Sequence, residues 1–132
     1  MGKRVLNVGH CSADGGAIKS FLKQHFDVDI VSAATADEAM SSLHNSPFDL
    51  VLINRVFDAD GESGLDLLQD IKKHAGLSKV PVILISNLPE AQKKALDRGA
   101  APGFGKQDIG TPKAIDRLAE ILSEDDSDNT DS

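Results

Sequence analysis

The sequence predicts an α/β fold in which a parallel sheet of five strands is covered by helices on both faces. Short runs rich in leucine and β-branched residues alternate with segments of helical periodicity, and short polar loops join them. Residues 48–54 form an almost uninterrupted apolar run, which is typical of a strand buried on both faces of a parallel sheet. We therefore place this run at the centre of a doubly wound sheet with right-handed crossovers.

The first half of the chain is predicted to contain two strands before the central one. Residues 4–9 form the first strand, and the turn after Gly9 leads into a helix with apolar residues at helical spacing. Residues 28–31 alternate in polarity, which favours an outer strand. Thr35 and Glu38 match a capping box, so a second helix is expected to begin there.

The second half continues the same alternation. Residues 55–63 are predicted to form a polar loop before a third helix. Residues 80–86 predict the fourth strand, and Pro89 suits the first turn of the helix after it. Residues 101–105 predict a weak fifth strand, which contains a proline and two glycines, and the last helix is expected to begin at Pro112.

Length and charge favour one domain with a short tail. We predict a single domain over residues 1–123 of the 132-residue chain. The net charge of −7 is concentrated in residues 124–132, because without their five acidic residues the chain has 16 acidic against 14 basic residues. These last residues are predicted to form a disordered acidic tail. The nearly neutral remainder argues against direct nucleic-acid binding, and the lack of a long apolar run argues against a membrane segment. The single cysteine is compatible with a cytoplasmic protein.

The polar residue at the end of the central strand is the first candidate site residue. In open parallel sheets, sites form just outside the carboxyl ends of the strands. Asn54 occupies this position on the central strand. An asparagine is neutral and weakly nucleophilic, so its chemistry differs from that of a carboxylate at the same place.

Residues 4–122 resemble a receiver domain of the bacterial response regulators. The resemblance implies a flavodoxin-like fold with strand order 2-1-3-4-5. It depends on the order of the elements together with four local patterns. These patterns are residues 49–54, residues 64–68, residues 81–86, and Gly99–Ala100 followed by Lys106.

The resemblance also implies where receiver chemistry would lie. Receivers accept a phosphoryl group on an aspartate that ends the third strand, and they bind Mg²⁺ with that aspartate and an acidic pair ending the first strand. Asn54 stands at the acceptor position, and Gly9 and His10 stand at the acidic pair. A carboxamide cannot form the acyl phosphate, and these three residues do not make a magnesium site. The resemblance therefore implies a degenerate receiver, or pseudo-receiver, with no catalytic residue, metal or cofactor.

Two pocket residues of the family are retained. Ser86 stands at the hydroxyl position that contacts the phosphoryl group, and Lys106 stands at the lysine position. Gly103 replaces the usual switch aromatic, and Gln107 replaces the proline after the lysine. We expect a phosphorylation-independent interaction module in two-component (phosphorelay) signal transduction, and no enzymatic activity. Its partner would be a signalling protein or a second copy, bound through the face formed by the fourth helix, the fifth strand and the fifth helix.

The charged residues leave alternatives open. Asp58 or Asp60, with Asp14, would offer carboxylates for a rebuilt cation site or for phosphorylation at an unusual residue. Lys106 either pairs with a loop acid such as Asp58 or leaves a positive pocket that binds an anion, with Ser86 and Asn54 as hydrogen-bond donors.

Three further hypotheses concern ligands and sensing. A small-ligand or flavin site on the same fold is disfavoured, because the first turn lacks a hydroxyl- and glycine-rich cradle and the chain has no Trp or Tyr. Cys11, near the start of the first helix, is either a redox-sensitive thiol or a small wall residue. His10 is either a pH-sensitive group or an unconstrained polar replacement.

Overall fold

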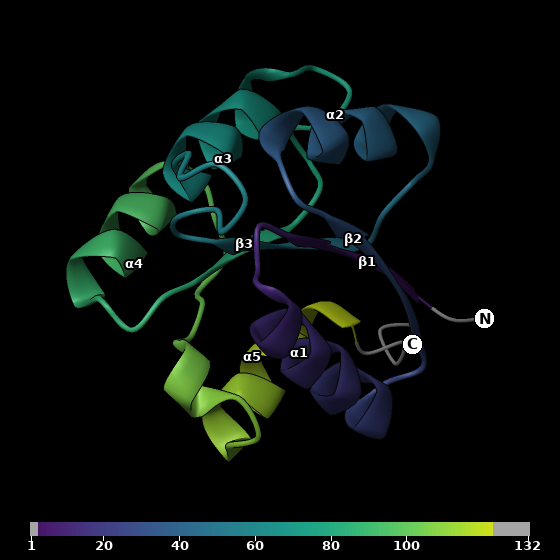
Figure 1. Cartoon of the computed structure of the whole chain (residues 1–132), viewed down its shortest axis with the longest axis vertical. Coiled ribbons are helices and arrows are strands. Elements are labelled where there is room, and N and C mark those ends of the chain that lie inside the picture. The colour runs from purple at the N-terminus through teal and green to yellow at the C-terminus, as the bar shows by residue number, and fades with distance from the viewer. Residues whose placement is uncertain (1–2, 123–132) are drawn as a thin grey trace, which may run out of the picture.

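The computed structural model describes residues 3–122 as a three-layer α/β fold (Figure 1). The strands are β1 (Lys3–Val8), β2 (Val28–Ala33), β3 (Leu50–Asn54) and β4 (Val82–Ile85). The helices are α1 (Ser12–His25), α2 (Ala36–Asn45), α3 (Gly64–Lys73), α4 (Pro89–Asp97), the short 3-10 helix η1 (Lys106–Asp108) and α5 (Pro112–Leu122).

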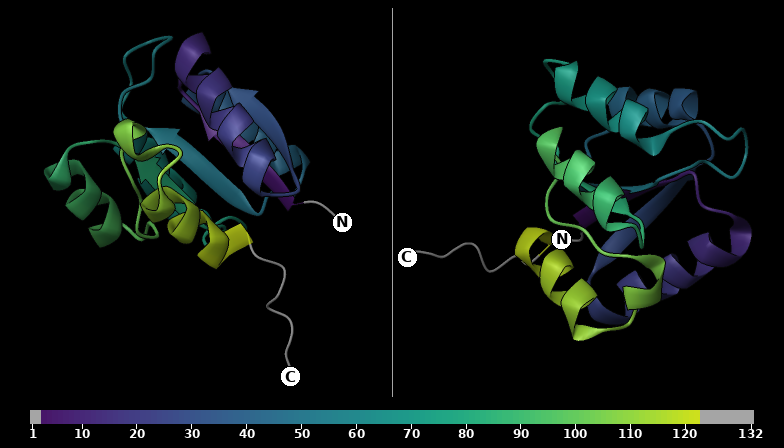
Figure 2. Two further views of the ribbon diagram at one scale, coloured as in Figure 1. Left: turned by 90° about the horizontal axis from the view of Figure 1, so that it is seen from below. Right: turned by 90° about the vertical axis from the view of Figure 1, so that its left-hand side faces the viewer.

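All strand pairs in the described sheet are parallel, and the strand order is β2-β1-β3-β4. α2 and α3 lie on one face of the sheet, α1 and α5 lie on the other, and α4 lies at the β4 side (Figures 1 and 2). This arrangement confirms the predicted flavodoxin-like fold class and the outer position of β2.

The central strand is buried on both faces, as its composition predicts. All five residues of β3 are buried. Val51 and Ile53 pack into the apolar cluster beneath α2 and α3, whereas Leu50 and Leu52 pack into the cluster beneath α1 and α5. Because β3 pairs with β1 and β4, its last residue lies where the carboxyl ends of three strands meet.

Side-chain caps fix two of the helix starts next to that edge. Thr35 Oγ1 accepts a hydrogen bond from Glu38 N at 3.2 Å, and the Glu38 carboxylate reaches back to Ala34 N at 2.9 Å. This is the predicted capping box, except that the Glu38 carboxylate accepts from the N–H of Ala34 and not from that of the N-cap residue Thr35. At α1, Cys11 Sγ accepts from Asp14 N at 3.4 Å and acts as the N-cap.

The prediction of a fifth strand is wrong, because residues 101–105 do not form a regular strand. Residues 101–105 keep a single parallel bridge, between Phe104 and Ile85, and two backbone hydrogen bonds, from Ala101 N to Val82 O at 2.8 Å and from Ser86 N to Phe104 O at 3.0 Å. Pro102 has no N–H to donate, and a side-chain amide supplements the remaining backbone bonds: Gln92 Nε2 donates to Leu84 O at 2.8 Å, to Ser86 O at 3.1 Å and to Phe104 O at 3.3 Å. A helix residue therefore joins β4 to the segment that the sequence predicts as its neighbour.

The domain boundaries stay a prediction. Residues 3–122 form a continuous sheet with its covering helices, whereas the proposed acidic tail, residues 124–132, lies outside the described residues. None of the described helices is long and apolar enough to cross a membrane.

We predict that Gln92→Ala lowers the free energy of unfolding by about 1–3 kcal/mol, because it removes the Gln92 donor from the carbonyl oxygens of Leu84 and Ser86. Urea denaturation measures this change. Gln69→Ala, at an exposed position of α3, is the matched control and should cost less than about 0.5 kcal/mol. Equal losses in the two variants would show that the Gln92 bridge does not hold β4 to residues 101–105.

Candidate functional site

The carboxyl edge of the sheet brings three of the predicted site residues into one cavity. Asn54 ends β3, Ser86 follows β4, and Lys106 begins η1. Together they line a cavity of about 330 Å³. They meet because carboxyl ends of neighbouring parallel strands lie at the same edge.

The Asn54 side chain is held by two backbone carbonyls. Its Nδ2 donates to Gly9 O at 3.1 Å and to Val56 O at 2.7 Å. Since carbonyl oxygens only accept, the amide nitrogen must be the atom on that side. A carboxylate in the same place would set an oxygen against both carbonyls, so this environment favours a neutral amide over an anion.

A phenylalanine ring occupies the space beside Gly9. Gly9 has a φ of +80°, and a Cβ at this position would lie 2.2 Å from Phe57 Cδ1. The Phe57 side chain is 1% exposed and belongs to the core. No residue with a side chain fits at position 9 without moving this ring, so the position cannot supply a metal ligand in this arrangement.

Phe57 is the site residue that sequence reasoning missed. Residues 55–63 were predicted as a polar loop, but Phe57 turns inward and the loop closes over Gly9 through a bond from Asp58 N to Gly9 O at 2.9 Å. An apolar pair, Val56–Phe57, inside a polar loop was the available signal. A lone aromatic in a loop does not show by itself whether it points into the core.

The loop carboxylates lie outside the cavity. Asp58, Asp60 and Glu62 are exposed, and Asp60 Oδ1 accepts from Glu62 N at 3.0 Å within the turn. Within residues 3–122, no three acidic, histidine or cysteine side chains are grouped closely enough to hold a metal ion. The loop therefore does not contribute carboxylates to a cation site in this conformation.

Lys106 forms an ion pair with a different acid from the one suggested by sequence. Its Nζ lies 2.7 Å from Asp14 Oδ2 at the start of α1, and Asp58 takes no part. The hydrogen bond from Lys106 holds the pKa of Asp14 below its usual value. The lysine charge is thus already balanced, which weakens the hypothesis of an anion bound by Lys106.

Ser86 is buried, and its hydroxyl is engaged locally. Its Oγ accepts from Leu88 N at 3.1 Å at the start of α4. This bond fixes the turn between β4 and α4. The Ser86 side chain lies beside Asn54 in the cavity but forms no hydrogen bond with it or with Lys106.

His10 lies apart from the Asn54 cavity. It lines a second cavity of about 510 Å³ between α1 and the ends of β1 and β2, together with Cys11. Neither ring nitrogen has a hydrogen-bond partner among the described residues. Burial, with the Lys106 charge as the second cause, lowers the pKa of His10 to about 4, so the imidazole is neutral at neutral pH.

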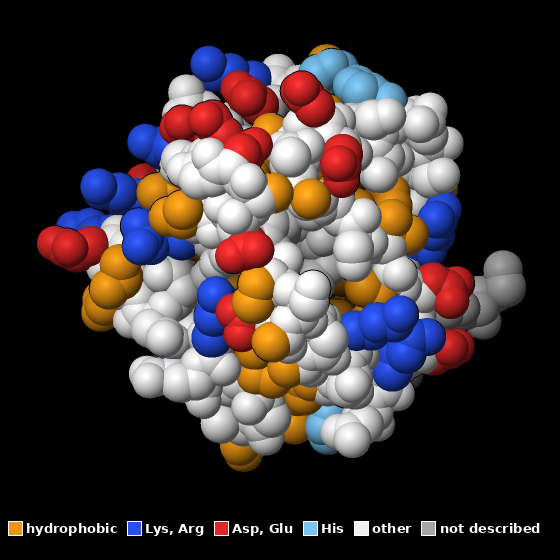
Figure 3. Space-filling model, viewed as in Figure 1, with side chains coloured by type: hydrophobic (Ala, Val, Ile, Leu, Met, Phe, Trp, Pro, Cys, Tyr) orange, Lys and Arg blue, Asp and Glu red, His pale blue; other side chains and the backbone are white. Residues whose placement is uncertain are grey.

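On the face viewed in Figure 3, acidic side chains gather in the upper part, whereas the basic side chains lie mostly toward the sides of the view and form no extended patch. This distribution agrees with the nearly neutral body that the sequence predicts. A nucleic-acid interface would need clustered positive charge, which this face lacks.

Comparison with known proteins identifies the family. The chain is 31% identical over 121 residues to the two-component response regulator ORR12 of Oryza sativa subsp. japonica, with 90% of this chain and 94% of that protein covered. The chain belongs to the response regulator receiver family. The fold is also similar to that of the signal receiver domain of the DNA-binding response regulator merR from Colwellia psychrerythraea, with a TM-score of 0.78 at 18% identity. The match covers 90% of this chain and 97% of that chain.

A longer relative contains a similar segment. The gliding motility regulatory protein of Myxococcus xanthus is 30% identical over 94 residues, which are 67% of this chain and 12% of that protein. No protein-family model matches the chain. As a receiver, the protein is a component of signal transduction.

We predict that Gly9→Ala lowers the free energy of unfolding by about 2–5 kcal/mol, because the methyl group meets the Phe57 ring and the backbone keeps a positive φ. In a Phe57→Ala background, the same substitution should cost only about 1–2 kcal/mol, since the backbone cost alone remains. Denaturant unfolding of the two single variants and the double variant measures this coupling.

Gly16→Ala is the control for this cycle. Nothing lies near the added methyl group in the middle of α1, so this variant should gain up to about 1 kcal/mol of stability. If Gly9→Ala cost the same with and without the Phe57 ring, the ring would not be what closes this position.

Proposed function

We propose that this receiver acts in signal transduction without being phosphorylated, by binding another protein. The observation that carries the proposal is the Asn54 amide, which donates to Gly9 O and Val56 O beside the buried Phe57 ring. A neutral amide at the acceptor position supports a receiver whose fold is kept and whose phosphorylation chemistry is lost.

The chemistry of phosphoryl transfer supports the same conclusion. Transfer to a receiver requires a carboxylate nucleophile and a cation that neutralises charge on the phosphoryl group. Asn54 stands where the family has that nucleophile, and a carboxamide does not form an acyl phosphate. At the acidic-pair positions, Gly9 has no side chain, and His10 is neutral and lines another cavity.

The retained residues have structural partners that support a stabilising role. Lys106 pairs with Asp14, and Ser86 fixes the turn into α4. The Lys106 side chain joins η1 to α1, and the Ser86 side chain holds the start of α4, both at the carboxyl edge of the sheet. Their presence is therefore compatible with a pocket that has no phosphoryl group to bind.

The output of such a receiver would be a protein contact. We place it on the surface formed by α4, residues 101–105 and α5, which is the output surface of the family. We propose no enzymatic activity, and the partner would be a signalling protein or a second copy of the chain. An input other than phosphorylation, such as a change in partner concentration, would then control the signal.

Incubation with acetyl phosphate and Mg²⁺ tests the proposal. Because the pocket has neither nucleophile nor cation ligands, we predict no gain in intact mass and no change in amide exchange from Ser86 to Lys106. A receiver that carries the aspartate and the acidic pair, treated in parallel, shows that the phosphodonor is active.

A stable mass gain of one phosphoryl group would contradict the proposal. The variant Asp58→Asn/Asp60→Asn then locates it, since loss of the adduct in this variant would assign phosphorylation to the loop. An adduct retained in that variant would assign it to another residue, and peptide mapping would identify the position.

A further inference from the structure

The cavity that contains His10 lies on the β2 side of β1, away from the Asn54 cavity. Its volume of about 510 Å³ is within the range of small-molecule sites in proteins. The end of β1, the first half of α1, the end of β2 and the start of α2 surround it. We call it the α1–β2 cavity, and the lining residues that matter here are Asn7, His10, Gly15, Lys19, Ser32 and Glu38.

The floor of the α1–β2 cavity is a pair of polar residues on a mostly apolar face of the sheet. Asn7 of β1 and Ser32 of β2 are partners in the parallel register. Each lies two residues after an apolar residue of the cluster beneath α1 and α5, and side chains two apart on a strand share a face. Asn7 is 3% exposed, so its amide occupies a position where the core would favour an apolar side chain.

Three buried polar atoms of the residues around this cavity have no hydrogen-bond partner. They are Asn7 Oδ1 and the two ring nitrogens of His10. Among the buried side-chain nitrogen and oxygen atoms of residues 3–122, these three alone lack a partner. An unpaired buried polar atom lowers stability, and native proteins usually satisfy such atoms. Because all three belong to one cavity, the cavity is suited to a ligand that supplies the missing bonds.

Two glycines of α1 keep side chains out of the space beside Asn7. A Cβ at Gly15 would lie 3.9 Å from Asn7 Nδ2 and 3.8 Å from His10 Cβ, which are ordinary contact distances. Nothing lies within 4 Å of a Cβ at Gly16. Packing therefore does not require glycine at either position, although each glycine weakens the helix relative to alanine. Their effect is to leave room in front of the two unpartnered side chains.

The unpartnered side chains favour a neutral polar group. Asn7 carries no charge, and burial lowers the pKa of His10 to about 4, so its imidazole is neutral at neutral pH. Together they offer both hydrogen-bond donors and acceptors. A carboxamide, which also has a donor beside an acceptor, complements them. An ion at the same place would lose its hydration without gaining an opposite charge.

Two exposed side chains of opposite charge line the same cavity. Lys19 comes from α1, and Glu38 comes from the start of α2. Glu38 Oε1 accepts from Ala34 N at 2.9 Å, which fixes the carboxylate beside the cavity. Within residues 3–122, Lys19 forms no ion pair. The rim of the cavity therefore offers one cationic and one anionic group to a zwitterion.

We propose that the α1–β2 cavity binds a free amino acid with a carboxamide side chain, such as glutamine. The carboxamide would exchange hydrogen bonds with Asn7 and His10, while the ligand carboxylate pairs with Lys19 and the ligand ammonium with Glu38. Such a ligand needs neither a phosphate cradle nor a stacking aromatic, the two features whose absence disfavours a flavin. The site does not depend on the proposed function, because it shares no lining residue with the Asn54 cavity.

Isothermal titration calorimetry of the full chain with L-glutamine tests the proposal. We expect saturable binding, which Asn7→Leu should weaken by about tenfold or more, because leucine has a similar size and no hydrogen-bonding group. The same variant should raise the midpoint of urea denaturation, since it replaces an unpaired buried amide with an apolar side chain. Asn45→Leu, at an exposed position of α2 outside the cavity, is the matched control and should leave affinity unchanged.

Two variants of α1 test the rim and the space. Lys19→Glu should weaken binding by about tenfold through lost attraction and added repulsion. Lys23→Glu, one turn further along α1 and outside the cavity, should change affinity less than about threefold, the range of a screened surface charge. Gly15→Leu should abolish binding, because its side chain fills the cavity, while leucine favours the helix. Circular dichroism confirms that the variants are folded.

Ligand analogues test the chemistry of recognition. L-Glutamate should bind more weakly than L-glutamine, because its side-chain carboxylate would lie beside neutral groups. L-Leucine should not bind, since it offers no hydrogen bond to Asn7 or His10. Equal affinity for glutamine and leucine, equal loss in Asn7→Leu and Asn45→Leu, or no saturable binding of glutamine at millimolar concentration would overturn the proposal.

Discussion

The two hydrogen bonds from Asn54 to backbone carbonyls organise the carboxyl edge of the sheet. They join the end of β3 to the residue after β1 and to the first residues of the following loop. That loop brings Phe57 against Gly9, and Asp58 N completes the contact by donating to Gly9 O. Where a phosphorylatable receiver needs a charged, hydrated pocket, this chain has a neutral amide and a packed ring.

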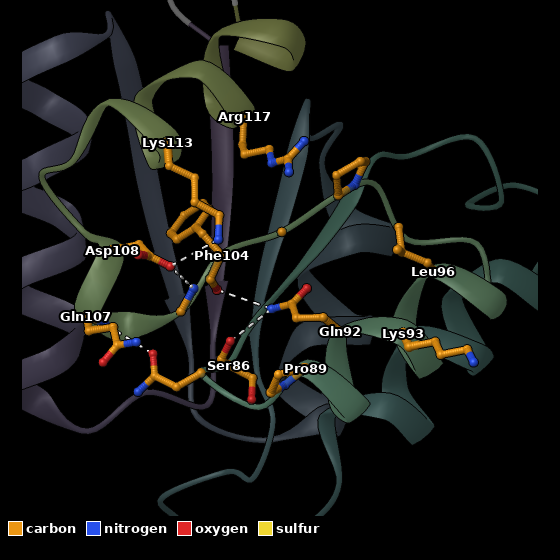
Figure 4. Close-up of a pocket in the computed structure, with 14 residues that line it drawn as sticks. Ser86, Pro89, Gln92, Lys93, Leu96, Phe104, Gln107, Asp108, Lys113 and Arg117 are labelled. Atoms are coloured by element: carbon orange, nitrogen blue, oxygen red, sulfur yellow. Dashed lines mark hydrogen bonds and ion pairs between the residues drawn. The ribbon is translucent and has the colours of Figure 1, made fainter.

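The opposite side of β4 depends on a second side-chain amide. Gln92 bonds three carbonyls, and the glycine at position 103 leaves room for it. A groove lined by Gln92 and Gly103 lies beside this edge of the sheet, between α4 and α5 (Figure 4). A side chain at position 103 would meet Leu84 O and Gln92 Oε1, so the glycine is required for this contact at the edge of the sheet.

Periodicity and composition were sufficient to predict the order of strands and helices, because buried parallel strands and capped helices leave local signals, as at β3 and Thr35. The order of elements also placed Asn54, Ser86 and Lys106 at one edge. Contacts between distant side chains left no such signal. Phe57 was predicted to lie in a polar loop, but its side chain is buried in the core. Lys106 pairs with Asp14 and not with Asp58. Gln92 bonds Leu84 O at the edge where the local sequence predicted a fifth strand.

A magnesium titration followed by amide NMR tests most directly whether the pocket has lost its cation site. We predict that the amide signals of Gly9, Asn54 and Val56 move no more with MgCl₂ than with NaCl at the same ionic strength, because an amide and a phenyl ring occupy the positions that cation ligands would need. A saturable shift of these three signals, specific to Mg²⁺, would show that a cation binds at this edge of the sheet and would contradict the loss of the cation site.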